Sequence, residues 1–156
     1  MNADVRELLA QLQQEPASLA KAIVLASGAP AVVRPLVPDD RVQLGAYFAG
    51  LSAETRRRFG PHPLDHATAD ALCAAIDPAR VLRIVALARG GGSEAVIAYV
   101  ILMLSVTAAE TERYAQRGIE LDGAVDCTLA PSVADAYQGQ GLGSQVLHYA
   151  LGIARG

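Results

Sequence analysis

The chain is short of several residue types, and each shortage excludes a class of protein. It has no tryptophan, only 4% aromatic residues and a single lysine, Lys21, so valine, leucine, isoleucine and alanine must build its core. Its two cysteines, Cys73 and Cys127, are too few for a disulfide framework. They are more consistent with small buried side chains in a reducing, cytoplasmic compartment.

Long apolar runs and an excess of positive charge are also missing. The longest unbroken apolar run, 95–104, is about half as long as a membrane-spanning helix. Near the N-terminus stand Asp4 and Glu7, without a basic-then-apolar leader. We therefore expect no membrane segment and no signal peptide. The net charge of −3 also argues against nucleic-acid partners.

Hydrophobic periodicity and turn residues divide the 156 residues into two parts. Residues 1–29 are expected to form an N-terminal helical extension, whose second helix runs over 18–26. Residues 30–156 are expected to form the main domain. Its strands are predicted over 31–36, 81–87, 95–106 and 123–130, with 95–106 buried on both faces, and its helices over 38–50, 53–59, 68–76, 107–119 and 142–154. This order predicts an α+β fold, with a mixed and largely antiparallel sheet flanked by helices.

The most informative motif is the glycine-rich run 138–144, which stands between a predicted strand and an amphipathic helix. Glycines let the backbone approach a ligand closely. The helix that follows presents unpaired N–H groups and the positive end of its dipole, which together suit a phosphate group. The alternative is that the glycines only form a tight strand-to-helix turn.

Two nucleotide-binding motifs fit this run poorly. A Walker loop needs a lysine before its serine or threonine, and no lysine is near Ser144. A dinucleotide fingerprint needs a third glycine where Ser144 stands, and an acidic residue at the ribose distance that the sequence does not supply.

A third motif fits at every position. Residues 138–143 satisfy Q/R-x-x-G-x-G/A, and the sequence over 133–147 resembles the coenzyme A loop of the GNAT superfamily of N-acyltransferases. Segments 33–36, 38–40 and 51–56 are similar to the first strand and helices of members akin to bacterial protein acetyltransferase domains. The resemblance covers about residues 31–155 and implies acetyl-CoA as co-substrate. It implies that the pyrophosphate is bound by Gln138, Gly139, Gln140, Gly141, Leu142, Gly143 and Ser144.

The resemblance also implies a gap beside the strand that precedes the loop, where the pantetheine arm of the coenzyme pairs with backbone groups. Pro131 cannot donate a ladder hydrogen bond, so strand pairing is expected to fail locally there. Ser132 and Val133 are the residues expected to offer the free groups. An ordinary strand end is the alternative.

The implied reaction transfers an acetyl group to an amine of a protein or small molecule, and a carboxylate usually removes the amine's proton. Many family members carry a glutamate on this strand, where Thr128 stands here. Asp126 on the same predicted face is the candidate base, and Asp122 is a second one; for both, a solvated strand residue is the alternative. The alternative function is a non-catalytic acyl-CoA-binding or interaction module of the same fold.

A complete fold of this family has further strands after the glycine-motif helix, so the domain is expected to be C-terminally incomplete. A fragment, a naturally shortened protein and a fold completed by a partner are the explanations. The exposed sheet edge could pair with a second copy in a homodimer. His62 and His66 have the spacing of helical metal ligands, but flanking prolines favour a solvated loop and no metal site. The arginines at 56–58 either help to hold phosphates or face water.

Overall fold

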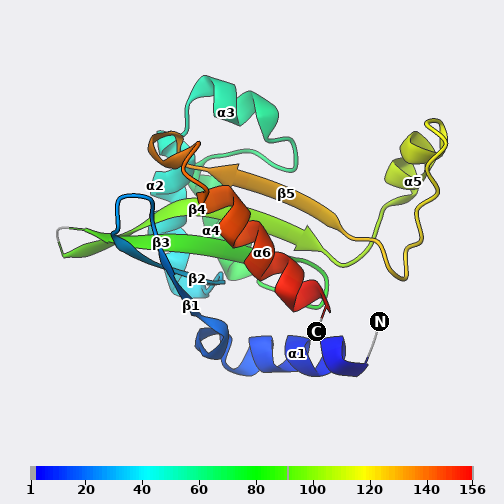
Figure 1. The fold of residues 1–156 in the computed structure, drawn as a ribbon, viewed down its shortest axis with the longest axis horizontal. Coiled ribbons are helices and arrows are strands. Elements are labelled where there is room, and N and C mark those ends of the chain that lie inside the picture. The colour runs from blue at the N-terminus through cyan, green and yellow to red at the C-terminus, as the bar shows by residue number, and fades with distance from the viewer. Residues whose placement is uncertain (1–2, 91, 156) are drawn as a thin grey trace.

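The computed structural model describes residues 3–90 and 92–155 of the chain. One antiparallel sheet has the strand order β1-β2-β3-β4-β5 (Figure 1). Its strands are β1 (Lys21–Val24), β2 (Pro30–Pro35), β3 (Leu82–Gly90), β4 (Ser93–Met103) and β5 (Thr128–Val133). The described ranges also hold six α-helices, α1 (Ala3–Gln14), α2 (Arg41–Gly50), α3 (Ala53–Arg58), α4 (His66–Ala74), α5 (Ala108–Ala115) and α6 (Leu142–Arg155), and three short 3-10 turns, η1 (Pro16–Leu19), η2 (Pro38–Asp40) and η3 (Asp135–Tyr137). The predicted α+β class is confirmed.

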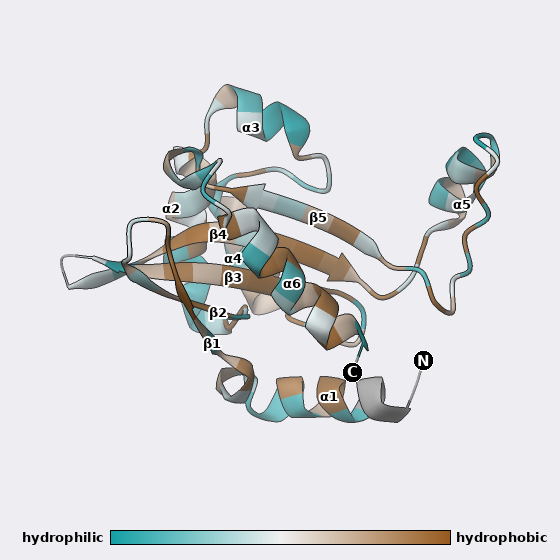
Figure 2. Ribbon diagram, viewed as in Figure 1, coloured by the Kyte–Doolittle hydropathy of each residue, from teal (hydrophilic) through white to brown (hydrophobic). Residues whose placement is uncertain are grey.

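Helices cover both faces of the sheet and bury β4, an interior strand that pairs with β3 and β5, on both sides. Ala98, Val100 and Leu102 pack with residues of α1 and α6, whereas Tyr99 and Ile101 pack with residues of α2 and α4, as the alternation of a strand requires. Figure 2 shows the inner strands in the brown of apolar residues and α3 and α5 largely in teal. The prediction that this strand is buried on both faces is confirmed, although the central strand of the five is β3.

Helix α6 is held on the sheet by one apolar stripe. Leu142, Val146, Ala150 and Ile153 are all buried, as the helical spacing predicts, and each large side chain contributes on the order of 1.5–3 kcal/mol by leaving water. This packing fixes the beginning of α6, where the glycine-rich loop ends. No helix in the described part of the chain is long and apolar enough to cross a membrane.

The segment before β2 differs from the helix predicted over 18–26. It forms η1 and then β1, which pairs with β2 so that the buried Ile23 stands opposite Ala31. Gly28, at φ +82°, donates its N–H to the Leu25 carbonyl at 2.8 Å and closes the connecting turn. The helix prediction is wrong because this glycine supplies the positive φ of a hairpin turn and does not end a helix.

The last strand begins later than the predicted 123–130. Val125 is 78% exposed, and the carboxylate of Asp126 accepts the backbone N–H of Asp122 at 2.7 Å. This hydrogen bond belongs to a turn that competes with sheet pairing. The alternation of side chains therefore predicted the wrong bounds, and β5 starts only at Thr128.

Between β4 and β5 the chain leaves the sheet in an excursion, residues 107–126, that contains α5 and projects away from the other helices (Figure 1). Thr107 caps α5: its hydroxyl accepts the Glu110 N–H at 3.2 Å, and the Glu110 carboxylate accepts the Thr107 N–H at 2.8 Å. The helix predicted over 107–119 is confirmed in a shorter form.

Candidate coenzyme cleft

A cleft of about 280 Å³ opens between α3, β5 and the beginning of α6. Two of its walls come from segments separated by about half of the chain. The lining residues are Thr55, Arg58 and Phe59 on one side, Pro131, Ser132 and Val133 along β5, and Gln138, Gly143 and Leu147 at the loop and α6. Ser132, Val133, Gln138 and Gly143, which the sequence singles out, are thus brought together in one site.

The glycine-rich loop presents the beginning of α6 to this cleft. Gly139 and Gly141 adopt φ values of +71° and +81°, a left-handed conformation that side chains with a Cβ rarely adopt. Helix α6 begins at Leu142, so the N–H groups of its first turn have no partner within the helix. These groups and the helix dipole can bind an anion such as a pyrophosphate.

Gln138 fastens the loop to both sides of the cleft. Its side-chain amide donates to the Val133 carbonyl at 2.9 Å and to the Thr55 hydroxyl at 3.1 Å. The Gln138 side chain therefore links the glycine-rich loop to β5 and to α3. Gln140, by contrast, donates to the Ala136 carbonyl at 3.0 Å within the loop itself.

Asp135 makes a second connection between the loop region and α3. Its carboxylate accepts the Ser52 hydroxyl at 2.5 Å, the Ser52 N–H at 3.0 Å and the Thr55 hydroxyl at 2.9 Å. The hydrogen bonds from Ser52, followed by the one from Thr55, lower the pKa of Asp135 to about 2. Ser52 is the N-cap of α3, but no local pattern links it to a residue 83 positions away.

The outer edge of β5 offers backbone groups to the cleft. The register pairs Pro131 with Val100, and just beyond the strand the Ala134 N–H donates to the Ile97 carbonyl at 2.8 Å. Because the direction of hydrogen bonding alternates along an antiparallel strand, residues 131 and 133 turn their backbone groups away from β4. The N–H that Pro131 lacks would point to the open edge, so the proline does not interrupt the pairing of β5 with β4. The predicted local failure of strand pairing is therefore wrong.

Ser132 has a different position from Val133. Its backbone groups face β4, and its buried hydroxyl donates to the Tyr99 carbonyl at 3.2 Å and contacts the Tyr47 hydroxyl at 2.9 Å. Burial raises the pKa of Tyr47. Because Ser132 gives its hydroxyl hydrogen to the Tyr99 carbonyl, the Tyr47 hydroxyl can donate to the Ser132 oxygen. Of the two residues expected to offer backbone groups, Val133 directs its N–H to the open edge, and Ser132 contributes its side chain to the cleft wall.

The carboxylates nearest the start of β5 come from the excursion. Asp126 precedes the strand, in the turn described above. Glu110, which the sequence patterns did not single out, accepts the hydroxyl hydrogen of Thr128 at 3.0 Å. Hydrogen bonds from Thr107 lower the pKa of Glu110. The spacing of Thr107 and Glu110 is that of a capping box, which marks the beginning of a helix in the sequence. It does not reveal that α5 lies beside β5.

The remaining polar candidates have structural contacts. Nε2 of His62 contacts the hydroxyl of Tyr99 at 3.0 Å, and burial lowers the pKa of His62. His66 lies against Gly45, and its Nδ1 stands in the space that a Cβ at residue 45 would take. Arg56 donates to the backbone carbonyls of Leu51, Leu64 and Phe48. Within the described ranges no group of three or more His, Cys, Asp and Glu side chains could hold a metal ion.

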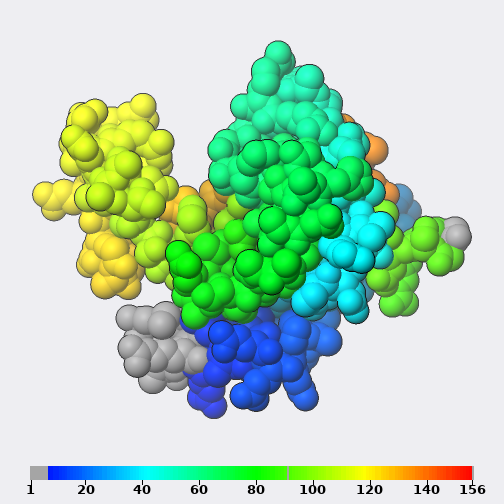
Figure 3. Space-filling view, turned by 180° about the vertical axis from the view of Figure 1, so that it is seen from behind, coloured from blue at the N-terminus to red at the C-terminus, as the bar shows by residue number. Residues whose placement is uncertain are grey.

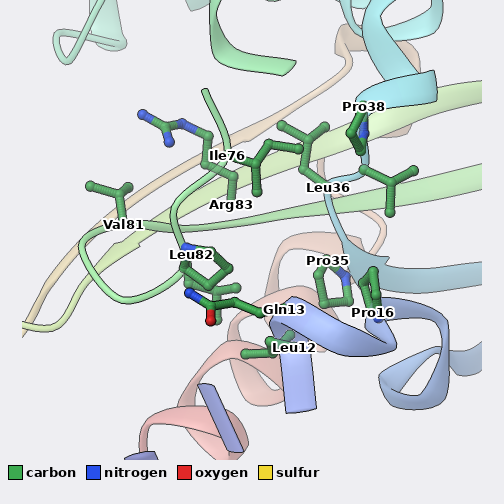
Figure 4. A pocket seen from close by; sticks show the side chains of 12 residues that line it. Leu12, Gln13, Pro16, Pro35, Leu36, Pro38, Ile76, Val81, Leu82 and Arg83 are labelled. Atoms are coloured by element: carbon green, nitrogen blue, oxygen red, sulfur yellow. The ribbon is translucent and has the colours of Figure 1, made fainter. Parts of the chain in front are cut away.

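A separate cavity of about 330 Å³ lies between α1, the end of β2 and the segment before β3 (Figure 4). Leucine, isoleucine, valine and proline side chains form most of its wall, and the guanidinium of Arg83 points away from it. The glycine-rich loop has no part in this cavity. The cleft at β5 is therefore the better candidate site, because it combines free backbone groups with a helix N-terminus.

No protein-family model and no curated protein sequence matches the chain. Solved structures do. The GNAT domain of S. lividans PAT matches with a TM-score of 0.65 and 26% identity over 90% of this chain. Mycobacterium smegmatis RimJ in complex with CoA-disulfide matches with a TM-score of 0.56 and 13% identity over 87% of this chain. The ribosomal-protein-S5-alanine acetyltransferase from Vibrio fischeri matches with a TM-score of 0.54 and 12% identity over 78%.

These matches define the class: the chain has the fold of the GNAT acetyltransferases. The predicted resemblance to bacterial protein acetyltransferase domains is confirmed by the likeness to the S. lividans domain. The chain spans 74% of the S. lividans domain, 61% of RimJ and 62% of the Vibrio enzyme.

Proposed function

We propose that the chain binds acetyl-CoA in the cleft at β5 and belongs to an N-acetyltransferase. One observation carries this proposal: the free N–H groups at the beginning of α6 and the open edge of β5 line the same cleft. The N–H groups at the beginning of α6 can bind a pyrophosphate, and the open edge of β5 can bind an extended arm with amide groups. Coenzyme A contains a pyrophosphate and such an arm. RimJ, which shares the fold, was solved in complex with CoA-disulfide, and this supports the choice of ligand.

The amides of residues 139–144 would hold the pyrophosphate. The pantetheine arm would then run along β5, where the Val133 N–H and the Pro131 carbonyl face the cleft. The Val133 carbonyl is already bonded to Gln138, so it helps to shape the loop. Arg58 lines the cleft and pairs with Glu54 on the exposed side of α3, from where it can exchange that partner for a phosphate.

The proposed reaction needs a neutral amine that attacks the thioester carbonyl carbon. A C–N bond forms, the C–S bond breaks, and the products are an N-acetylated amine and the free thiol of coenzyme A. The nitrogen loses one proton to a base, and the leaving thiolate gains one from solvent or an acid. A backbone N–H on the β5 edge can stabilise the oxyanion that forms in between.

Asp126 and Glu110 are the two proposed bases. Asp126 is held in the turn before β5 by the Asp122 N–H. Glu110 reaches the strand itself through Thr128, the position where the sequence resemblance places a glutamate. The geometry therefore favours Glu110, which would act through its own oxygen or through a water bridged to Thr128.

A non-catalytic acyl-CoA-binding module is the second candidate. The observation in its favour is that β5 itself carries Thr128 and no carboxylate along 128–133. Such a module would use the same cleft and loop, so coenzyme binding is common to both functions. Only turnover with an amine separates them.

The test is a calorimetric titration of acetyl-CoA into the chain and into two variants. Gly141→Glu places a carboxylate in the proposed pyrophosphate loop, and we expect it to abolish saturable binding. Gly118→Glu introduces the same charge at another glycine of positive φ, +74°, in the turn after α5, and should bind normally. Equal binding by all three proteins, or no binding by the unaltered chain, would contradict the proposal.

A further inference from the structure

The excursion of residues 107–126 carries the whole net charge of the chain. It contains five acidic residues and two arginines, a net charge of −3, and the full sequence has 16 acidic and 13 basic residues, also −3. The other residues therefore balance at 11 acidic and 11 basic. Because the negative charge is concentrated in the excursion, this end of the molecule should attract positively charged partners.

The excursion also exposes apolar side chains. Of the five large hydrophobic residues that are exposed among those described, three stand on it: Tyr114, Ile119 and Val125, with exposed fractions of 36%, 48% and 78%. Exposed apolar groups rimmed by charge are typical of surfaces that contact another protein.

Figure 3 shows where such a partner would lie. The excursion, in yellow, stands apart from the dome formed by α3 and α4, and a notch separates them with the orange of β5 at its base. Thr128 is the first residue of β5 and lies at the end of this notch that is nearest the excursion. Pro131, on the wall of the coenzyme cleft, follows three residues later, which is about 10 Å along a strand.

From this geometry we propose that the excursion is the docking surface for the acceptor, and that the acceptor is a lysine in an extended, basic segment of a second protein. The proposal rests on the acetyltransferase function proposed above. An extended segment in the notch would place its lysine at the coenzyme cleft and residues roughly three positions away against the excursion. A small amine would need only the cleft. Nucleic acid would bring negative charge to a negative surface, and a second copy of this chain, whose residues outside the excursion balance in charge, would bring no positive excess.

The experiment measures binding and needs no turnover. A fluorescein-labelled peptide with one central lysine and arginines on both sides is titrated with the chain, and its twin carries glutamates in place of the arginines. We expect the basic peptide to bind at least about tenfold more tightly than the acidic one. In Glu112→Lys/Glu120→Lys, which changes two exposed residues of the excursion, this preference should be lost.

The matched control is Glu15→Lys/Asp70→Lys, which makes the same change in total charge at exposed residues outside the excursion and should keep the preference. Calorimetry with acetyl-CoA should give one affinity for all three proteins. If acetyl-CoA does not bind, the function proposed above fails. If acetyl-CoA binds but the chain binds neither peptide, or binds both alike, or if the excursion variant keeps the preference, the docking proposal is overturned. Concentration-dependent dimerisation that Glu112→Lys/Glu120→Lys abolishes would also overturn it, in favour of a second copy.

Discussion

The carboxylate of Asp135 and the hydroxyl of Ser52 lie 2.5 Å apart although 83 residues separate them in the sequence. One belongs to the connection between β5 and α6, and the other caps α3. Their hydrogen bond, with the one that Thr55 adds, joins the two walls of the candidate coenzyme cleft at its rim. The position of α3 and the shape of the glycine-rich loop are therefore coupled.

This coupling predicts a dependence of stability on pH. The pKa of Asp135 is lowered to about 2 in the folded chain, against about 3.9 for an unfolded aspartate. Its contribution to the free energy of unfolding is therefore fully present above about pH 4 and is lost as the pH falls towards 2. Asp135→Asn should be less stable than the unaltered chain at pH 7, and the difference should shrink between pH 4 and pH 2.

Urea unfolding at a series of pH values checks this prediction. Asp39→Asn, at an exposed carboxylate, is the control and should change stability little at any pH. A constant difference between Asp135→Asn and the unaltered chain across the acid range would contradict the role given to Asp135.

Much of this architecture could be predicted from the sequence, and the failures share a physical cause. The stripe on α6 and the doubly buried β4 follow from periodicity, because those segments bury their side chains in regular patterns. The hairpin at Gly28 and the late start of β5 did not follow, because turn hydrogen bonds override the local pattern there. The glycine motif located the loop of the proposed coenzyme site, but Asp135 and Glu110 acquire their contacts only through tertiary packing.

Gly141 and Gly143 should respond oppositely to alanine. Gly141 has φ +81°, so Gly141→Ala should destabilise the fold by about 1–2 kcal/mol. Gly143 lies in α6, and a Cβ there would meet Val133 Cγ2 at an ordinary 3.6 Å, so Gly143→Ala should stabilise the fold by about 0.5 kcal/mol. Because this Cβ enters the cleft, Gly143→Ala should nevertheless weaken acetyl-CoA binding. Thermal unfolding and calorimetry separate the two effects, and unchanged coenzyme affinity in Gly143→Ala would argue against the cleft as the coenzyme site.

Gln138 should affect the coenzyme through the loop that it holds. Gln138→Ala removes the donors to Val133 and Thr55, so the loop amides lose their fixed orientation and acetyl-CoA affinity should fall several-fold, by about 1 kcal/mol for a lost hydrogen bond. Gln140→Ala, the matched control in the same loop, should have little effect. If both variants bind the coenzyme alike, Gln138 does not preorganise the loop.

Glu110 and Asp126 can be told apart as bases by isosteric substitution. Glu110→Gln keeps an oxygen that can cap α5 and removes the charge, so the fold should persist while acetyl transfer falls by about 10²–10⁴-fold, the usual contribution of a general base. Asp126→Asn should preserve most of the rate.

The lowered pKa of Glu110 means that it stays ionised at lower pH than an ordinary glutamate, so this group should not limit the rate between pH 5 and 7. The pH–rate profile of single-turnover acetylation, with acetyl-CoA bound at saturation, checks these expectations. A large loss of rate in Asp126→Asn with normal turnover in Glu110→Gln would reverse the assignment, and normal turnover in both would show that neither carboxylate removes the proton.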